Sequence, residues 1–176
     1  MEITDINDFL DYYKKVRKRT LRLIKHIPAD KIEWSYHPDK FTFGDLIRHL
    51  ANTERYMYCE NVCFRPSLYP GHGTEFAEGY DNIVAYLNEK HQESLEVLGQ
   101  ITSEDLQKKC TTPGGVALRV WKWLRLMAEH EIHHRGQMYT YLGFLGETVP
   151  SIYGLTEQEM HANSIKQQQE TQEQKQ

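Results

Sequence analysis

Long apolar runs are absent from this chain of 176 residues. A helix that crosses a bilayer needs about 20 consecutive apolar residues, and no stretch of the sequence reaches that length. The first residues, MEITDINDFLDYYKK, also lack the basic start, apolar core and small-residue cleavage site of a signal peptide. We therefore expect a soluble, cytoplasmic protein that does not associate with membranes.

A large excess of charge of one sign is absent as well. The formal net charge is −4, and Lys and Arg are spread among Asp and Glu. A dedicated nucleic-acid surface would show basic residues gathered in a patch or along a helix. We therefore expect no nucleic-acid partner and consider a small-molecule substrate instead.

Cysteine is scarce: the chain has only Cys59, Cys63 and Cys110. This odd number, without a Cys-x-x-Cys pair, predicts neither a disulfide framework nor a redox motif. Cys59 and Cys63 are one helical turn apart and in principle suit a soft metal, but no second pair accompanies them, so packing is the simpler interpretation. The chain is long enough to bury the core of one domain without disulfides.

Four segments show the apolar period of amphipathic helices. We predict helices over residues 6–27, from about Thr42 to Met57, over residues 80–98 and over residues 121–145. Pro28 ends the first helix, the Thr42 hydroxyl caps the second, and Gly146 ends the fourth. With no convincing strand ladder and no internal repeat, the prediction is an all-α protein, an antiparallel four-helix bundle.

The connecting segments are long. Residues 29–40 have no period, residues 64–79 are rich in Pro and Gly, and residues 101–119 are rich in turn-forming residues, although 116–119 alternate as in a short strand. Thr156 is placed to cap a short C-terminal helix. From Ser164 the sequence is too polar to pack, so we expect a disordered tail or a frayed helix over residues 164–176, after a domain over residues 1–163.

Three of the nine histidines gather in five residues of the fourth predicted helix. His130 and His134 are four residues apart and share one helix face, whereas His133 points outward. Zinc and nickel favour imidazole nitrogen, and a third ligand must then come from another helix. His49 is the best candidate, because it lies at the edge of the apolar face of the second helix. A chance spacing of surface histidines is the competing interpretation.

Other polar residues are less specific. The run His-Glu-Ile-His-His is not the His-Glu-x-x-His motif of zinc proteases, so peptidase chemistry has no support. His72 in the loop is expected to be solvated. His91 faces the apolar side of the third helix and is either a core or pocket histidine or a group that touches metal or substrate. Glu54 falls among apolar residues and needs a partner.

Glu131 and Arg135 are four residues apart and both fall on the apolar side of the fourth helix. We expect them to form a buried or interface ion pair, with Glu54 as a further counterion for Arg135. A role in structure is a better interpretation of this pair than a role in catalysis.

Three segments of the chain resemble a known family. FTFGDLIRHLANTE at residues 41–54 and HEIHHRGQ at residues 130–137 are similar to the two signature segments of the DinB-like superfamily of four-helix-bundle metalloproteins, and PSIYGL at residues 150–155 is similar to its closing turn. The resemblance covers about residues 5–155 and implies one divalent metal ion per chain, often zinc or nickel, with His49, His130 and His134 as ligands. It also implies a homodimer and, in branches with known activity, transferases and isomerases that use a low-molecular-weight thiol such as bacillithiol or mycothiol.

Three functions remain open at this point. The first is a metal-dependent thiol S-transferase that acts on small electrophiles, since three protein ligands leave a coordination position free. The second is a metal-dependent hydrolase, in which a carboxylate such as Glu54 or the imidazole of His91 assists a metal-bound water. The third is a damage or stress metalloprotein without enzymatic activity. Glu54 and His91 are the catalytic candidates.

Overall fold

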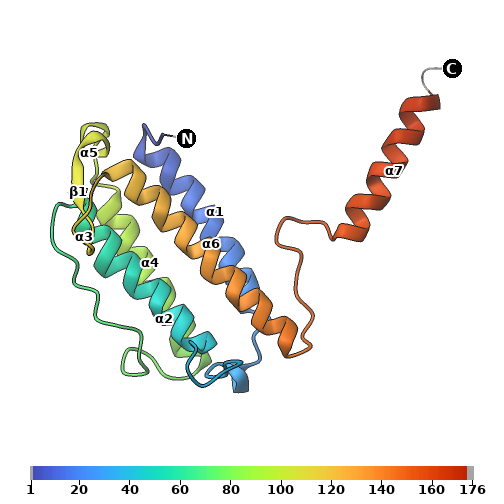
Figure 1. Cartoon of the computed structure of the whole chain (residues 1–176), viewed down its shortest axis with the longest axis horizontal. Coiled ribbons are helices and arrows are strands. Elements are labelled where there is room, and N and C mark those ends of the chain that lie inside the picture. Colours follow the sequence, from blue (N-terminus) through green and yellow to red (C-terminus); the bar gives the residue numbers. More distant parts are fainter. Residues whose placement is uncertain (1, 174–176) are drawn as a thin grey trace.

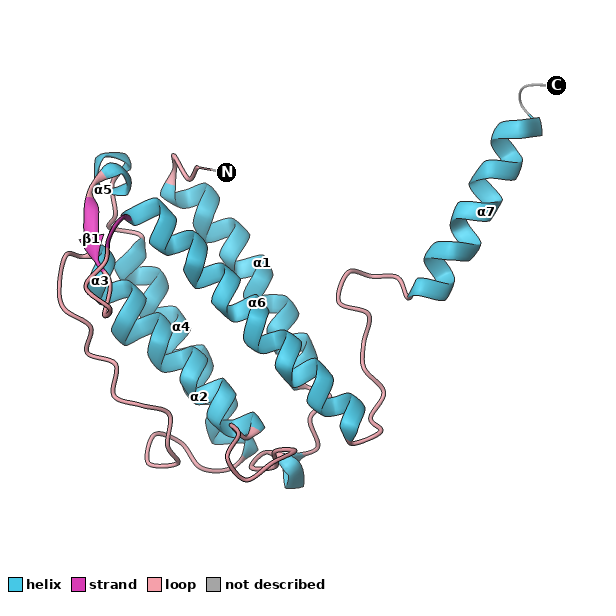
Figure 2. Cartoon of the chain, in the orientation of Figure 1, coloured by secondary structure: helices cyan, strands magenta, loops and turns pink. Residues whose placement is uncertain are grey.

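The computed structural model of the protein describes residues 2–173. It is mostly helical and contains one small two-stranded sheet (Figures 1 and 2). The long helices are α1 (Ile6–Ile24), α2 (Phe43–Thr53), α4 (Tyr80–Leu98), α6 (Val120–Phe144) and α7 (Glu157–Glu173). The shorter elements are the 3₁₀ turn η1 (Ala29–Lys31), the π-helical segment η2 (Glu54–Tyr58), α3 (Cys59–Val62), α5 (Ser103–Gln107), β1 (Lys109–Thr111) and β2 (Ala117–Arg119).

The helix boundaries follow the local signals of the sequence. The Thr42 hydroxyl accepts a bond from the Asp45 N–H at 2.9 Å, and the Asp45 carboxylate accepts one from the Thr42 N–H at 2.9 Å, so a complete capping box starts α2. Gly146, with φ of 74°, follows the end of α6 in a conformation that favours glycine. Thr156 caps α7 through Glu159 in the same way as Thr42 caps α2.

Two helix ends differ from prediction. Helix α1 stops at Ile24, because the chain tightens into turns before Pro28, with the Ile27 N–H bonded to the Ile24 carbonyl at 2.9 Å. The second helix is longer than predicted, since α2 continues through η2 and α3 as far as Val62. The alternation at residues 116–119 does become a strand, and β2 pairs antiparallel with β1, which no sequence pattern predicted.

The four longest helical segments of the body are α1, the continuous run α2–η2–α3, α4 and α6, and they lie side by side (Figure 1). Their buried apolar residues form two clusters, one at each end of this body. The first cluster includes Phe9, Val62, Leu98 and Leu124, and the second includes Ile24, Ile47, Leu87 and Leu142. Helices α1 and α6 therefore run in one direction, and α2 and α4 in the other.

A layer of buried polar residues separates the two apolar clusters. Arg17 of α1, Glu54 of η2, and Glu131 and Arg135 of α6 are each at most 4% exposed. Arg17 forms an ion pair with Glu54 and lies 3.0 Å from a Glu131 carboxylate oxygen. Burial alone would lower the pKa of Arg17, but Glu131 and Glu54 outweigh it and raise that pKa.

The expected ion pair between Glu131 and Arg135 does not form in the described structure. Both Glu131 and Glu54 pair with Arg17 instead, and Arg135 donates to the Val16 carbonyl at 3.2 Å. Helical spacing alone suggested the Glu131–Arg135 pair, but the packing of α1 on α6 offers Glu131 a guanidinium from another helix. Two carboxylates and two guanidinium groups still balance in charge within this layer.

Helix α7 lies outside the packed body. Figure 1 shows it apart from the other helices, and its residues up to 172 are exposed. The short helix expected from Thr156 thus extends past Ser164 to Glu173, while residues 174–176 of the expected tail lie outside the described residues. Within residues 2–173, no helix combines the length and apolarity needed to cross a membrane.

Removal of Arg17 should strongly destabilise the protein. In an Arg17→Ala variant the two buried carboxylates lose their shared counterion, so we expect a loss of about 3–5 kcal/mol in the free energy of unfolding at pH 7. Urea denaturation followed by circular dichroism measures this loss. The adjacent Lys18 is exposed, and Lys18→Ala should change the free energy by less than about 0.5 kcal/mol. Equal stability of the two variants would contradict the proposed importance of the buried charges.

Candidate metal centre

Three histidines from two helices bring their Nε2 atoms together beside the polar layer. His49 comes from α2, and His130 and His134 come from successive turns of α6. The Nε2 atom of His130 lies 3.2 Å from that of His49 and 2.9 Å from that of His134. One ligand atom from each of the three residues lies within 4.8 Å of the other two, so the group can hold a metal ion.

The spacing of these nitrogens suits a first-row divalent metal. With metal–nitrogen distances of about 2.0–2.1 Å, two ligands of a tetrahedral site lie about 3.3 Å apart. The measured separations of 2.9 and 3.2 Å are close to this value. Within residues 2–173, this is the one group of three or more His, Cys, Asp or Glu side chains with such geometry.

The environment keeps the three imidazoles neutral at pH 7. Burial, with a smaller contribution from the neighbouring imidazoles, lowers the pKa of His49 to about 3 and that of His130 to about 4. Burial also lowers the pKa of His134. A neutral imidazole has a free lone pair, which is the form that binds a metal. The site is therefore prepared to bind a cation rather than an anion.

Hydrogen bonds at the opposite ring nitrogens orient two of these ligands. The Nδ1 atom of His134 lies 2.7 Å from the Gln137 amide oxygen, which can only accept, so Nδ1 carries the proton and the Nε2 lone pair faces the centre. The Nδ1 atom of His49 lies 2.7 Å from the Tyr69 hydroxyl, and that hydroxyl lies 3.3 Å from Nδ1 of His72. A chain of donors from His49 through Tyr69 to His72 leaves Nε2 of His49 free for metal.

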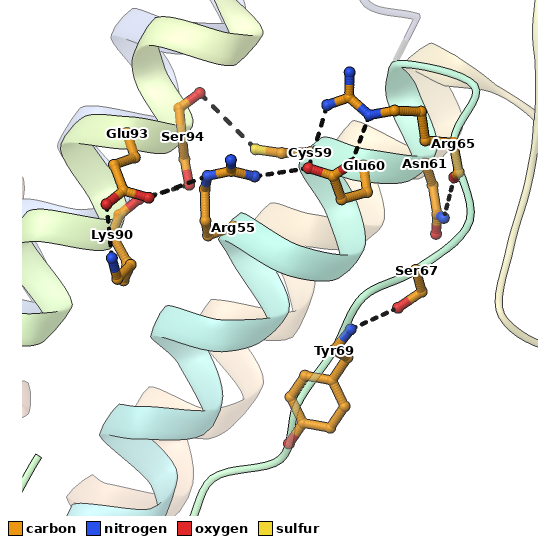
Figure 3. Close-up of polar contacts among 10 residues, drawn as sticks. All are labelled: Arg55, Cys59, Glu60, Asn61, Arg65, Ser67, Tyr69, Lys90, Glu93 and Ser94. Carbon is orange, nitrogen blue, oxygen red and sulfur yellow. Dashed lines mark hydrogen bonds and ion pairs between the residues drawn. The ribbon is translucent and has the colours of Figure 1, made fainter. Parts of the chain in front are cut away.

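Tyr69 and His72 lie on the long segment between α3 and α4, which polar contacts hold against the helices. Figure 3 shows the start of this segment, where Glu60 accepts bonds from Arg55 at 2.8 Å and from Arg65 at 2.6 Å. Further along, the Leu68 N–H donates to the Tyr56 carbonyl at 2.7 Å. These contacts fix the backbone on both sides of Ser67, so Tyr69 is presented to His49 from a defined position.

The structure brings together the three histidines singled out as ligands and leaves His133 exposed. The expectation for His72 was wrong. Its ring is only partly exposed and packs against Phe41, with ring centroids 4.1 Å apart and an interplanar angle of 36°. The Phe41 ring also lies 5.5 Å from that of His49. Sequence reasoning missed Tyr69 altogether, because residues 64–79 have no period from which a side-chain direction can be inferred.

The catalytic candidates Glu54 and His91 meet each other but are not members of the three-histidine group. The Nδ1 atom of His91 lies 2.7 Å from a Glu54 carboxylate oxygen, whose other oxygen pairs with Arg17. The partner that Glu54 needs is thus a guanidinium from α1 together with an imidazole from α4. This geometry ties Glu54 and His91 to the buried charges between the apolar clusters.

The cysteines lie apart from these groups in role: the Cys59 thiol is buried and donates to the Ser94 carbonyl at 3.8 Å.

Fold and site together define a helical protein with a three-histidine centre able to hold a metal ion. A family model described as the DinB superfamily matches residues 12–138, which is well over half of the chain. The protein therefore belongs to the DinB superfamily, as its signature segments suggested.

Individual relatives agree with this assignment. The uncharacterized protein YjoA of Bacillus subtilis (strain 168) is 23% identical over 155 residues, which cover 84% of this chain and 95% of YjoA. A crystal structure of a DinB-like protein from Bacillus cereus ATCC 10987 matches with a TM-score of 0.70 at 18% identity, covering 84% of this chain and 97% of the other. The crystal structure of YjoA matches with a TM-score of 0.68 at 18% identity, with 82% and 97% covered.

A more distant structure belongs to an enzyme. The mycothiol-dependent maleylpyruvate isomerase, solved as a histidine-to-alanine mutant, matches with a TM-score of 0.59 at 15% identity. The match covers 76% of this chain and 60% of the isomerase chain. At such identities, structural likeness shows a shared fold and nothing more specific.

Removal of the Tyr69 hydroxyl should weaken metal binding without breaking the site. A Tyr69→Phe variant keeps the ring but loses the acceptor that orients His49, and losses of outer hydrogen bonds of this kind lower metal affinity about 10- to 100-fold. Competition against a chelator of known zinc affinity measures the change. Tyr12→Phe, a matched change at an exposed tyrosine of α1, should leave the affinity unchanged. Equal zinc affinities of the two variants would exclude an orienting role for Tyr69.

Proposed function

We propose that this protein binds one divalent metal ion per chain, zinc or nickel, through His49, His130 and His134, and that it is a metal-dependent enzyme of the low-molecular-weight thiol S-transferase type. The observation that carries the proposal is the convergence of three neutral Nε2 atoms on one point. Three protein ligands are typical of catalytic metal sites, where further positions are left to water or substrate. A structural zinc site would be closed by a fourth protein ligand.

The metal would supply a Lewis acid that lowers the pKa of a bound thiol and favours the nucleophilic thiolate at neutral pH. The protein's own residues prepare the site for this chemistry. Tyr69 and Gln137 hold His49 and His134 with their Nε2 lone pairs turned inward. The aromatic rings of Phe41 and Tyr58 lie 5.5 Å from His49 and 5.9 Å from His130 and give the site an apolar border.

The thiol and the assembly are proposed on the basis of likeness. The name of one structural neighbour includes mycothiol dependence, and a small thiol such as mycothiol or bacillithiol fits a site that leaves metal positions open. We further infer that the four long helical segments form a four-helix bundle and that two copies associate as a cytoplasmic homodimer, as the family resemblance implies. The hydrolase and the non-enzymatic functions have no separate observation in their favour.

The metal content of purified protein tests the site directly. Wild type should contain close to one zinc or nickel ion per chain by elemental analysis, and His49→Ala should lose it, because two imidazoles of one helix remain. His133→Ala is the matched control, since this exposed histidine lies in the same run but outside the group, and its metal content should equal that of wild type. A wild-type protein that takes up no divalent metal even when it is offered would overturn the proposal.

Thiol consumption tests the reaction class. We expect metal-loaded protein to accelerate the loss of a small thiol in the presence of a test electrophile, measured by reaction of the remaining thiol with a chromogenic disulfide. The acceleration should disappear in His130→Ala and after chelation, and it should persist in His133→Ala. Turnover that survives both the substitution and the chelator would show that the histidine centre is not the catalyst.

A further inference from the structure

A hollow of about 640 Å³ lies between the segment after η1 and the last turns of α6. The residues that matter most in its lining are Tyr36, Phe41, His134, Gln137, Tyr141 and Phe144. A volume of this size falls within the range of about 300–1,000 Å³ that is typical of small-molecule sites. Neither the resemblance to the family nor the matched proteins assign a function to this hollow.

The hollow adjoins the candidate metal centre through two shared residues. His134 is one of the three converging histidines and also lines the hollow. Phe41 lines the hollow as well, and its ring lies 5.5 Å from that of His49. A molecule in the hollow would therefore contact His134, one of the three converging histidines.

Part of the wall of the hollow is aromatic and exposed, and polar residues that include Asp39 and Lys40 complete it. The ring of Tyr36 lies 5.3 Å from that of Tyr141 at an interplanar angle of 73°, and 5.8 Å from that of Phe144 at 51°. Tyr36 is 50% exposed and Phe144 is 63% exposed. Tilted contacts of this kind leave ring faces open, and another aromatic ring can pack against them in the offset or edge-on geometry that aromatic pairs prefer.

The position of these exposed rings points to a ligand. Exposed apolar side chains that stand alone are normal on a protein surface, but a group of them around a concavity marks a site of interaction. Tyr36 and Phe144 contact each other and belong to the same concave surface, next to groups that can hold a metal. A small aromatic molecule would cover both rings and lie against His134.

We propose that this hollow is the subsite for the aromatic part of the substrate, so that the substrate of the metal centre is a small molecule with an aromatic ring. The inference rests on the proposed function for the role of the bound molecule as a substrate. The binding of an aromatic ring itself is independent of catalysis, and it can be measured whether or not the protein turns over thiols.

Binding of 1-naphthalenemethanol, followed by its fluorescence, tests the subsite on the full chain. The saturated analogue decahydro-1-naphthalenemethanol, used as a competitor, has a similar size but no aromatic ring and should bind more weakly. Phe144→Ala should lower the affinity for the naphthyl compound about three- to tenfold, the equivalent of one lost aromatic contact. Phe144→Leu keeps most of the apolar surface and should lie between wild type and Phe144→Ala.

Phe64→Ala is the matched control, because Phe64 is 49% exposed and follows Cys63, which packs against the apolar cluster at the other end of the body. Its naphthyl affinity should equal that of wild type. If Phe144→Ala binds the naphthyl compound as tightly as wild type, the proposed subsite is wrong. If Phe144→Ala instead shifts a dimer to monomer in analytical ultracentrifugation while naphthyl affinity is unchanged, the aromatic face is an interface between copies and the proposal is overturned.

The metal content of the same samples separates this inference from the proposed function. Naphthyl binding that depends on Phe144 in a protein without metal would leave the subsite standing and reject the metal-dependent reaction. If metal content and thiol turnover are normal but Phe144→Ala binds the naphthyl compound as tightly as wild type, the subsite is rejected and the proposed function stands.

Discussion

The burial of one guanidinium group organises the surroundings of the candidate metal centre. Arg48 has no exposed surface, and it is paired with Glu33 at 2.6 Å and with Asp45 at 2.8 Å. Its remaining donors bond the carbonyls of His72 at 2.8 Å and Ala77 at 3.1 Å. A buried cation must be matched in this way, because leaving it unpaired costs several kcal/mol. The turn of α2 that carries His49 therefore also holds the two irregular segments beside it, which contain Glu33 on one side and His72 and Ala77 on the other. Gly44 leaves room for the Glu33 carboxylate, because a Cβ atom at position 44 would lie 2.6 Å from one of its oxygens.

The need to pair buried charges also explains why polar groups form a layer across the body. Apolar clusters occupy the two ends, and between them each long helix contributes polar residues at the same level: Arg17 from α1, Glu54 from η2, His91 from α4 and Glu131 from α6. Inside the body Arg17 pairs with both carboxylates and His91 contacts Glu54, although the Glu131 oxygens accept no hydrogen bond within the described residues. At the face between α2 and α6 the layer consists of neutral imidazoles with free lone pairs, and a cation from outside can complete it. The buried charges and the three-histidine group are therefore two parts of one polar layer.

Sequence reasoning reached the local features of this arrangement and missed those that depend on distant packing. The spacing of His130 and His134 and the position of His49 on its helix edge are properties of single helices, so periodicity placed them correctly. The partner of Glu131 depends on how α1 packs against α6. Arg17 could have been noticed, since it lies four residues after Tyr13 and three before Thr20 on the buried stripe. No comparable signal existed for Tyr69 and His72, because a segment without a period gives no side-chain direction.

The direction of the helices explains why such a segment lies beside the three histidines. Since α2 and α4 run the same way, the chain that leaves Val62 has to return along the whole body before α4 begins at Tyr80. Figure 1 shows this return along the outside of α2, the helix that carries His49. A crossover that returns along the whole body must pass the level of the histidines. There the Asn52 side-chain amide donates to the Gly71 carbonyl at 2.8 Å, and the Arg48 guanidinium donates to the His72 carbonyl at 2.8 Å, so the crossover backbone is held in place. Most residues of the crossover lie outside the apolar clusters, so this topology allows the surroundings of the three histidines to vary while the histidines keep their places on α2 and α6.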